Sequence, residues 1–394
     1  MKLPQELLDE IHGHQDDKQS LRNFSLVSKP WLDPSRRRLF ETVKIRQETL
    51  ESWWNIIPPT NDGVLRHVRS LTYLAAIDIF RTLFPSEYCL DVIREYFPSL
   101  PQLRHFSLGS RRLNVISRDI DMFSPFRHTL VRLSLEHRNV KIGTFVTLIN
   151  YFPNLNRLDL SGLFRMEDYE PTPPLSRQLL RELHVRGGDL DANFLDRLSE
   201  LGLAFEEIVL NAQPIRVQPV ERIVNAVGVS VKRLRLLDPL ETCMCITLET
   251  EPTARRTEHS FPSDNTGTTT LSRCQELQEL EMILSYPGEE IANIISSITS
   301  TSIRKMTFVH NPWVGCRSYH RYHTAWEKLG NHLCRFVDRL GCERELEVDF
   351  RPTRRKEQTG KPNVLESLTE FREKCGVRVF WDGSESVVSS DAVV

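Results

Sequence analysis

The sequence lacks the segments that direct proteins into the secretory pathway or into membranes. Its first residues, Met1 to Glu6, include a proline and a carboxylate where a secretory signal needs an uninterrupted apolar run. No stretch approaches the roughly 18 to 20 apolar residues that a membrane-spanning helix requires. We therefore expect a protein of the cytoplasm and/or the nucleus that has no membrane partner.

Cysteine pairs and an excess of charge of one sign are also missing. The eight cysteines include no Cys-x-x-Cys pair, so neither a zinc ribbon nor a thiol redox motif is present, and we expect reduced thiols. The chain has 51 Lys and Arg against 53 Asp and Glu, which gives a net charge of -2. A chain this close to neutral exerts no strong overall attraction on phosphate backbones, and we expect no nucleic-acid partner.

The common catalytic motifs are absent too. The chain contains no phosphate-binding P-loop, since Gly360 and Lys361 are followed by Pro362, and no Gly-x-Ser-x-Gly motif of serine hydrolases. A group of possible metal ligands matches no standard zinc spacing; its members are Cys316, His320, His323 and Cys334. We therefore predict that the protein is not an enzyme, has no catalytic residues and binds neither a cofactor nor a metal.

What the sequence does contain is a repeat. At 394 residues and 40% hydrophobic composition, the chain can bury a large core. A unit of the form apolar-x-x-apolar-x-apolar recurs eight times, mostly at steps of 25 to 27 residues. The units start at Leu103, Leu130, Leu155, Leu180, Phe205, Val231, Leu277 and Ile303.

The spacing within the units predicts an α/β solenoid. The last two apolar residues of each unit alternate with a polar one, as in a short strand with one buried face. Several intervening segments show helical spacing, such as Phe145, Leu148, Ile149 and Phe152. One strand and one helix per 20 to 29 residues is typical of the leucine-rich-repeat solenoid, with parallel strands on the concave side and helices outside.

The ends of the repeat region are less regular. Val68, Leu71 and Tyr73 predict an irregular first unit. Two further strands are predicted around Leu346 and Val348 and around Val377 and Val379. A longer step predicts an inserted loop near 238–273. The small polar residues of 383–394 predict a disordered tail.

The first 45 residues predict a small helical head. The first helix follows Pro4, and the second is capped by Asp16 or Asp17 and carries an apolar stripe that reaches Trp31. Pro34 is expected to start a third helix. Three helices in about forty residues bury too little surface to be stable alone, which indicates a partner.

This head resembles the F-box motif, in the form found in fungal proteins with degenerate leucine-rich repeats. The resemblance rests on Leu-Pro-x-Glu-Leu-Leu-x-x-Ile from Leu3, Ser-Leu-Val-Ser-Lys-x-Trp from Ser25, and the closing Leu39 and Phe40. It implies docking to a Skp-family adaptor and, through it, to cullin and RING subunits. The matching positions are Leu3, Pro4, Leu7, Leu8, Ile11, Leu21, Val27, Trp31, Leu39 and Phe40. Gln15 departs from the pattern, which usually has an apolar residue there. The alternative is that these helices only cap the solenoid, which is compatible with docking.

The resemblance divides the chain into four regions. They are an F-box-like head at 1–45, linking helices and an irregular first repeat at 46–100, the solenoid at 101–382, and the tail. A target protein is expected to contact polar strand positions on the concave side, although most such positions only face water. Our candidates are Arg104, Arg132, Arg157, Arg181, His184, Arg233 and Arg235. Their neighbours carry mixed charge, which favours a shaped protein or peptide over a polyanion.

The function implied is that of a substrate-recognition subunit of a cullin–RING (SCF-type) ubiquitin ligase, in the ubiquitin conjugation pathway. The alternative is a scaffold that uses the same surfaces for protein–protein interaction without a ligase. The sequence alone does not distinguish the two.

Overall fold

A computed structural model describes residues 17–27, 29–46, 49–74, 94–109, 120–136, 142–161, 180–186, 200–201, 203–211, 223–225, 227–237, 271–284, 289–310, 319–340, 346–352, 378–381 and 384–385. The chain forms two compact units, Met1–Leu180 and Arg181–Val394. The first unit therefore contains the head as well as the first repeats. Each unit is an α/β structure built on parallel strands.

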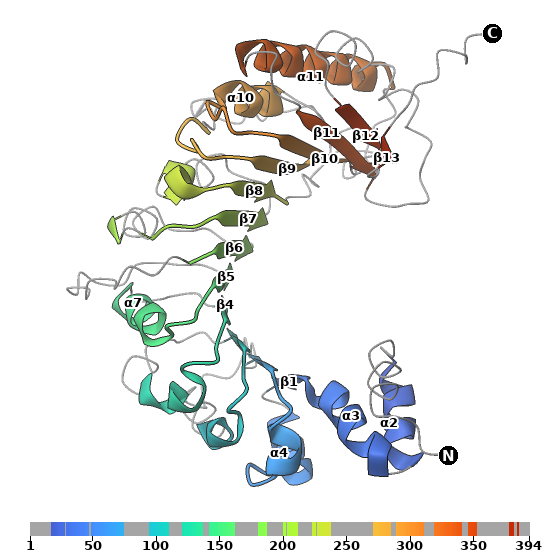
Figure 1. Cartoon of the computed structure of the whole chain (residues 1–394), viewed down its shortest axis with the longest axis vertical. Helices are drawn as coiled ribbons and strands as arrows, with labels where there is room; N and C mark the ends of the chain where they lie inside the picture. Colours follow the sequence, from blue (N-terminus) through green and yellow to red (C-terminus); the bar gives the residue numbers. More distant parts are fainter. Residues whose placement is uncertain are drawn as a thin grey trace, which may run out of the picture. The chain divides into compact units, whose positions relative to one another are not determined.

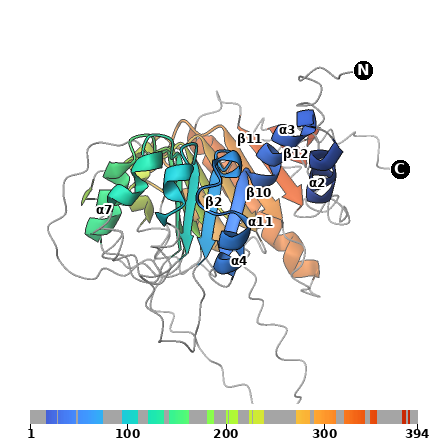
Figure 2. The same ribbon diagram turned by 90° about the horizontal axis from the view of Figure 1, so that it is seen from below.

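Unit 1 begins with helices and continues as alternating strands and helical segments. Its described elements are α2 (Lys18–Val27), α3 (Lys29–Phe40), β1 (Thr42–Arg46), α4 (Leu50–Ile56), α5 (Asp62–Leu65), β2 (Ser70–Leu74), η2 (Phe97–Ser99), β3 (His105–Gly109), η4 (Ile120–Phe126), β4 (Arg132–Glu136), α7 (Ile142–Tyr151) and β5 (Arg157–Ser161). Helices α4 and α7 lie on the same side of the strands, and α2 and α3 lie beyond the β1 edge (Figures 1 and 2).

The strands of unit 1 pair in chain order, each parallel to the next, without a shift in register. The second positions of β2 to β5 form one row, in which Leu71 pairs with Phe106, Phe106 with Leu133, and Leu133 with Leu158. Because side chains alternate along a strand, the fourth positions point to the same face, and both rows are buried. Successive strands that pair in this way are consistent with a solenoid-like arrangement.

A repeated backbone contact joins the starts of neighbouring strands. The carbonyl oxygen of Arg69 accepts hydrogen bonds from the backbone N–H groups of Arg104 and His105, at 2.8 and 2.9 Å. The carbonyl of Arg104 accepts from Val131 and Arg132 in the same way, at 2.8 and 3.0 Å. In both cases the carbonyl oxygen before one strand pairs with the two backbone N–H groups at the start of the next strand, so these groups are satisfied, as burial requires.

Phenylalanine side chains fill the space between the strands of unit 1 and its helical segments. Phe126 is fully buried, and its ring centroid lies 5.2 Å from that of Phe97, 5.7 Å from Phe123 and 6.3 Å from Phe152. These rings come from η2, from η4 and from the residue that follows α7. The aromatic cluster therefore ties three successive repeats together.

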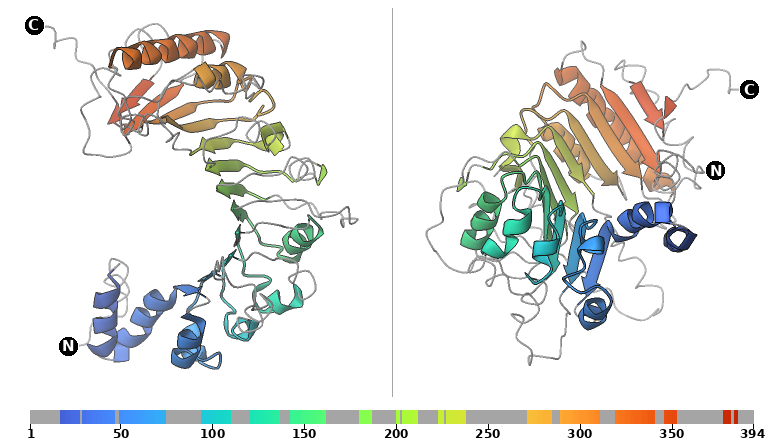
Figure 3. Two further views of the ribbon diagram at one scale, coloured as in Figure 1. Left: turned by 180° about the vertical axis from the view of Figure 1, so that it is seen from behind. Right: turned by 60° about the horizontal axis from the view of Figure 1, so that its bottom comes forward.

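Unit 2 continues the same construction. Its described elements are β6 (Glu182–Arg186), β7 (Glu207–Asn211), η5 (Gly228–Ser230), β8 (Arg233–Leu236), β9 (Glu279–Leu284), α10 (Glu289–Ser297), β10 (Lys305–His310), α11 (Tyr319–Leu340), β11 (Glu347–Pro352), β12 (Arg378–Trp381) and β13 (Ser384–Glu385). Strands β6 to β12 pair in parallel in chain order. Figure 3 shows α10 and α11 on the same side of strands β9 to β11.

The structure confirms the strands that the repeat predicts. The eight units coincide with β3 to β10, and the weaker signals at Leu71, Val348 and Val379 coincide with β2, β11 and β12. Helix α7 contains three of the apolar residues that predicted a helix there, Phe145, Leu148 and Ile149, and all three are buried.

Several boundaries in the head differ from the predicted ones. Trp31 lies in α3 rather than in the second predicted helix, because α2 ends at Val27. Pro34 does not start a helix but lies inside α3, where it removes one backbone donor and is buried. Helix α3 is followed after one residue by β1, a strand that the sequence prediction omitted.

Two predictions near the C-terminal end also need correction. Ser384 and Glu385 form β13, antiparallel to β12, so these two residues of the predicted disordered tail pair with the preceding strand. The predicted insertion lies largely outside the described residues. Leu271, however, is fully buried in the turn before β9, so it belongs to the repeat and not to the loop.

We expect Phe126→Ala to lower the free energy of unfolding by about 3 to 5 kcal/mol, because it leaves a cavity at the centre of the aromatic cluster. Ile56→Ala is the control, since Ile56 is 74% exposed and its truncation should change stability by less than about 0.5 kcal/mol. Urea unfolding of the full chain measures both variants. Equal effects would contradict the packing described for Phe126.

Candidate interaction surfaces

The described part of the head is a pair of helices with a defined start. Asp17 caps α2, because its carboxylate accepts hydrogen bonds from the backbone N–H of Ser20 at 2.7 Å and of Gln19 at 3.3 Å. The Ser20 hydroxyl donates to the same carboxylate at 2.7 Å. These hydrogen bonds, that of the Ser20 hydroxyl first, hold the pKa of Asp17 below its ordinary value. The predicted cap is thus confirmed at Asp17.

The candidate adaptor contacts have different environments in the structure. Leu21 is buried, whereas Trp31, Leu39 and Phe40 are half-buried on α3, which packs against α2. Val27 is the last residue of α2. Five candidates lie outside the described residues; they are Leu3, Pro4, Leu7, Leu8 and Ile11.

Leu26 is an apolar surface residue that the list of candidates omitted. It is 84% exposed on α2 and lies within the Ser-Leu-Val-Ser-Lys-x-Trp segment. The apolar stripe of Leu21, Phe24 and Val27 did not include it, because it is on a different face of the helix. Its exposure makes it a candidate contact residue, and this exposure is known only from the structure.

The face of the unit 1 sheet opposite its buried leucines carries a basic cluster. Arg132 and Arg157 occupy the first positions of β4 and β5, and both contact the carboxylate of Asp159, whose side chain is only 3% exposed. Arg157 Nε donates to Asp159 Oδ1 at 3.1 Å, and Arg132 Nε donates to Oδ2. Two of the candidate arginines are therefore oriented by one buried carboxylate.

Arg104 and His105 extend this cluster toward β3. Arg104 is exposed, and its side chain makes no hydrogen bond or ion pair with the residues that the structure describes. Burial lowers the pKa of His105, and the nearby charges of Arg132, Arg157 and Arg104 lower it further. His105 is therefore mainly neutral at pH 7, and the cluster's positive charge comes from its arginines.

The candidate arginines of unit 2 are paired with acidic residues on neighbouring strands. Arg233 lies 2.9 Å from Glu207 and Arg235 2.8 Å from Glu281, while Arg181 lies 3.5 Å from Glu206. The hydrogen bond with Glu281 raises the pKa of Arg235 above its ordinary value. These pairs stabilise the register of the sheet and leave little net charge on this face of unit 2.

Two neighbouring groups complete the unit 2 face. Lys232 Nζ donates to Glu206 at 3.0 Å, and this hydrogen bond lowers the pKa of the Glu206 carboxyl. His184 is 8% exposed and lies 3.5 Å from the carboxylate of Glu182. Of the candidate target contacts, His184 therefore offers the least surface to a partner.

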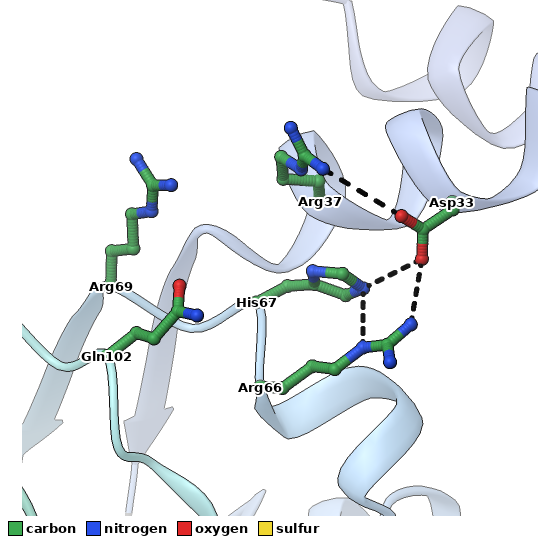
Figure 4. Close-up of a pocket in the computed structure, with 6 residues that line it drawn as sticks. All are labelled: Asp33, Arg37, Arg66, His67, Arg69 and Gln102. Carbon is green, nitrogen blue, oxygen red and sulfur yellow. Dashed lines mark hydrogen bonds and ion pairs between the residues drawn. The ribbon is translucent and has the colours of Figure 1, made fainter.

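A polar pocket lies in unit 1 between the head and the first repeats (Figure 4). Its walls come from α3 and from the turns before β2 and β3, and they consist of Asp33, Arg37, Arg66, His67, Arg69 and Gln102. The Asp33 carboxylate lies 3.0 Å from Arg66, 3.2 Å from His67 and 3.9 Å from Arg37. Burial is the main reason that the pKa of His67 lies below its ordinary value, although Asp33 opposes this shift.

Possible metal ligands and a buried thiol are the remaining groups of interest among the described residues. Among them, no three His, Cys, Asp or Glu side chains form a group that could hold a metal ion. Burial raises the pKa of the Cys274 thiol to about 12, so this thiol stays protonated at neutral pH. No helix in the described part of the chain has the length and apolar character needed to span a membrane.

No protein-family model matches the chain, and the search of curated proteins yields no significant match.

We expect Asp159→Asn to lower the free energy of unfolding by about 1 to 3 kcal/mol, because it removes the buried negative charge that Arg132 and Arg157 both contact. Arg104→Gln removes a charge from the same cluster without breaking a described contact, so its effect should stay within about 0.5 kcal/mol. Chemical unfolding of both variants measures the difference. A loss for Arg104→Gln as large as that for Asp159→Asn would contradict the assigned role of the carboxylate.

His67 should make the stability of unit 1 depend on pH. Its pKa in the folded chain lies below the ordinary 6.5, so as pH falls through 6.5 the unfolded chain takes up a proton that the folded chain does not. The free energy of unfolding should therefore fall below pH 6.5 and level off below the folded pKa. The neighbouring charges that act on the ring are Asp33, Arg66 and Arg37.

His67→Gln removes this titration, so the stability difference between wild type and variant should shrink from pH 8 to pH 5.5. Urea unfolding over this range provides the measurement, with pH 8 as the internal reference. A difference that does not change with pH would show that His67 does not carry this linkage.

Proposed function

We propose that this protein is a non-enzymatic substrate-recognition subunit of a cullin–RING (SCF-type) ubiquitin ligase. In this proposal the F-box-like head binds a Skp-family adaptor, and the polar face of a leucine-rich-repeat solenoid binds the target protein. The observation that carries it is an apolar residue, Leu26, that is 84% exposed within the motif-bearing helix pair, directly before stacked parallel repeats.

The exposure of Leu26 supports docking of the head. A leucine on the surface of a small helical pair gains free energy when a partner covers it, by about 1.5 to 3 kcal/mol for full burial. The head contacts α5 and β1 through α3, whereas Leu26 lies on α2, so capping of the repeats does not need Leu26. The head therefore keeps an apolar surface free after it has packed onto the first repeats.

The charge of the unit 1 face supports a target with acidic groups. Arg104 has no partner among the described residues, and Arg132 and Arg157 both contact the carboxylate of Asp159. Arginines that a buried carboxylate holds in place lose little conformational entropy on binding and are frequent in binding hot spots. On the unit 2 face, the candidate arginines are neutralised by glutamates, so we assign the stronger target contacts to unit 1.

In this role the protein would accelerate ubiquitin transfer by proximity alone. Binding the adaptor and the target on one chain raises the effective concentration of the target's lysines near the ubiquitin carrier. No side chain of this protein takes part in the chemistry.

Leu26→Ala should weaken binding of the full chain to a purified Skp-family adaptor by about tenfold or more, because a buried leucine contributes on the order of 1.4 kcal/mol or more. Val229→Ala is the matched control; Val229 is also an exposed apolar residue, at 63%, but lies in unit 2. Calorimetry with the adaptor measures both variants. Unchanged affinity for Leu26→Ala would argue against docking through this helix.

The alternative function is a scaffold that binds partners without a ligase. Both functions use the same surfaces, and they differ in whether cullin is recruited. Affinity purification of the full chain and of a chain without residues 1–45 distinguishes them. Cullin that is recovered only with the full chain supports the ligase subunit, whereas an adaptor complex without cullin favours the scaffold.

A further inference from the structure

The pocket beside α3 has the size of a small-molecule site. Its volume is about 400 Å³, and all six residues that line it are polar or charged. Asp33 and Arg37 come from α3, Arg66 and His67 follow α5, and Arg69 and Gln102 precede β2 and β3. Pockets of about 300 to 1,000 Å³ hold small ligands, and the few polar groups in them set the ligand's chemistry.

The lining has an excess of positive charge. Three arginines face one carboxylate, and with His67 neutral this leaves two unbalanced positive charges. Asp33 is the shared partner of Arg66, His67 and Arg37, at 3.0, 3.2 and 3.9 Å. Each guanidinium has five N–H donors, so a single carboxylate with about four acceptor positions leaves most of them unused.

Arg69 and Gln102 provide further hydrogen-bond donors to the pocket. Within the described part of the chain, neither side chain makes a hydrogen bond or an ion pair, and both lie across the pocket from Asp33 (Figure 4). The backbone of Arg69 makes hydrogen bonds through both its N–H and its carbonyl group. Its N–H donates to the carbonyl of Glu41 at 3.0 Å, and its own carbonyl accepts from Arg104 and His105. The turn that carries Arg69 is therefore fixed, while the donors of its guanidinium remain available to a ligand.

We propose that this pocket binds a phosphate monoester group, held mainly by Arg69 and Gln102 on one side and by Arg37 on the other. A phosphate dianion matches the two unbalanced charges, and its oxygens match the paired donors of a guanidinium. The lining contains no tyrosine, tryptophan or phenylalanine on which a base would stack, so a polynucleotide is a poorer fit. The inference goes beyond the proposed function and does not depend on adaptor docking.

A phosphate in this position would connect the head to the repeats. Arg37 belongs to α3, whereas Arg69 and Gln102 belong to the turns that lead into β2 and β3. A ligand that contacts both sides binds the folded chain and not the unfolded one, so it should raise the thermal unfolding temperature by mass action. The site would thus reinforce the joint between the two parts of unit 1.

The test uses calorimetry of the full chain with inorganic phosphate and with O-phosphoserine, at constant ionic strength and with chloride as the reference anion. We expect saturable binding at one site per chain. Arg69→Gln should weaken it about tenfold or more. Arg104→Gln is the matched control, because it removes the same charge from the same turn position one repeat later, outside the pocket lining, and should change the affinity less than about twofold.

Two further variants keep the test valid if Arg69→Gln folds poorly. Gln102→Ala removes an exposed donor and should weaken binding, while Asp33→Asn removes the competing carboxylate and should strengthen it. Tighter binding of O-phosphoserine than of phosphate would indicate a phosphorylated side chain as the source, and equal binding would indicate free phosphate. The proposal is overturned if wild type shows no saturable binding, or if Arg69→Gln and Arg104→Gln weaken it equally.

Discussion

Parallel pairing between successive strands is the constraint on which the rest of this structure depends. Because each strand pairs in register with the next strand of its unit, equivalent positions of successive repeats form continuous rows within a unit. The rows of Leu133 and Leu135 become buried, and the carbonyl before a strand, as at Arg69 and Arg104, accepts hydrogen bonds from two backbone donors of the next. A repeat cannot bury its apolar row alone, so its stability depends on its neighbours.

The same register determines which charged side chains lie next to each other on the opposite face of the strands. In unit 2 it places Arg233 beside Glu207 and Arg235 beside Glu281, so the charges neutralise each other across strands. In unit 1 it places Arg132 beside Arg157, and both contact the carboxylate of Asp159. Two sets of strands that are built in the same way therefore differ in charge. This difference, rather than a change of fold, makes unit 1 the more suitable surface for an acidic partner.

The strands could be predicted from the sequence because their signal is periodic and local. Phe40, Val43 and Ile45 follow the same spacing and coincide with β1, but this unit overlaps the end of the F-box-like head, and the strand is not among those predicted. The pocket has no such signal. Its residues come from three separate segments, are polar and show no period, so only the folded chain reveals that Asp33, His67 and Arg69 line one cavity. Likewise, the sequence does not distinguish Leu26 from a buried helical leucine, because only the structure shows that its side chain is exposed.

The connection between α3 and β1 limits how the head can move within unit 1. A single residue, Glu41, separates the two elements, and its carbonyl accepts hydrogen bonds from Arg69 and Ser70 of the next repeat. Asp33 adds side-chain contacts from α3 to Arg66 and His67. In the proposed function, a head attached by this short, hydrogen-bonded joint would hold a docked adaptor at a fixed distance from the basic face of unit 1. Transfer by proximity benefits from such a fixed distance, because a flexible tether would lower the effective concentration of the target.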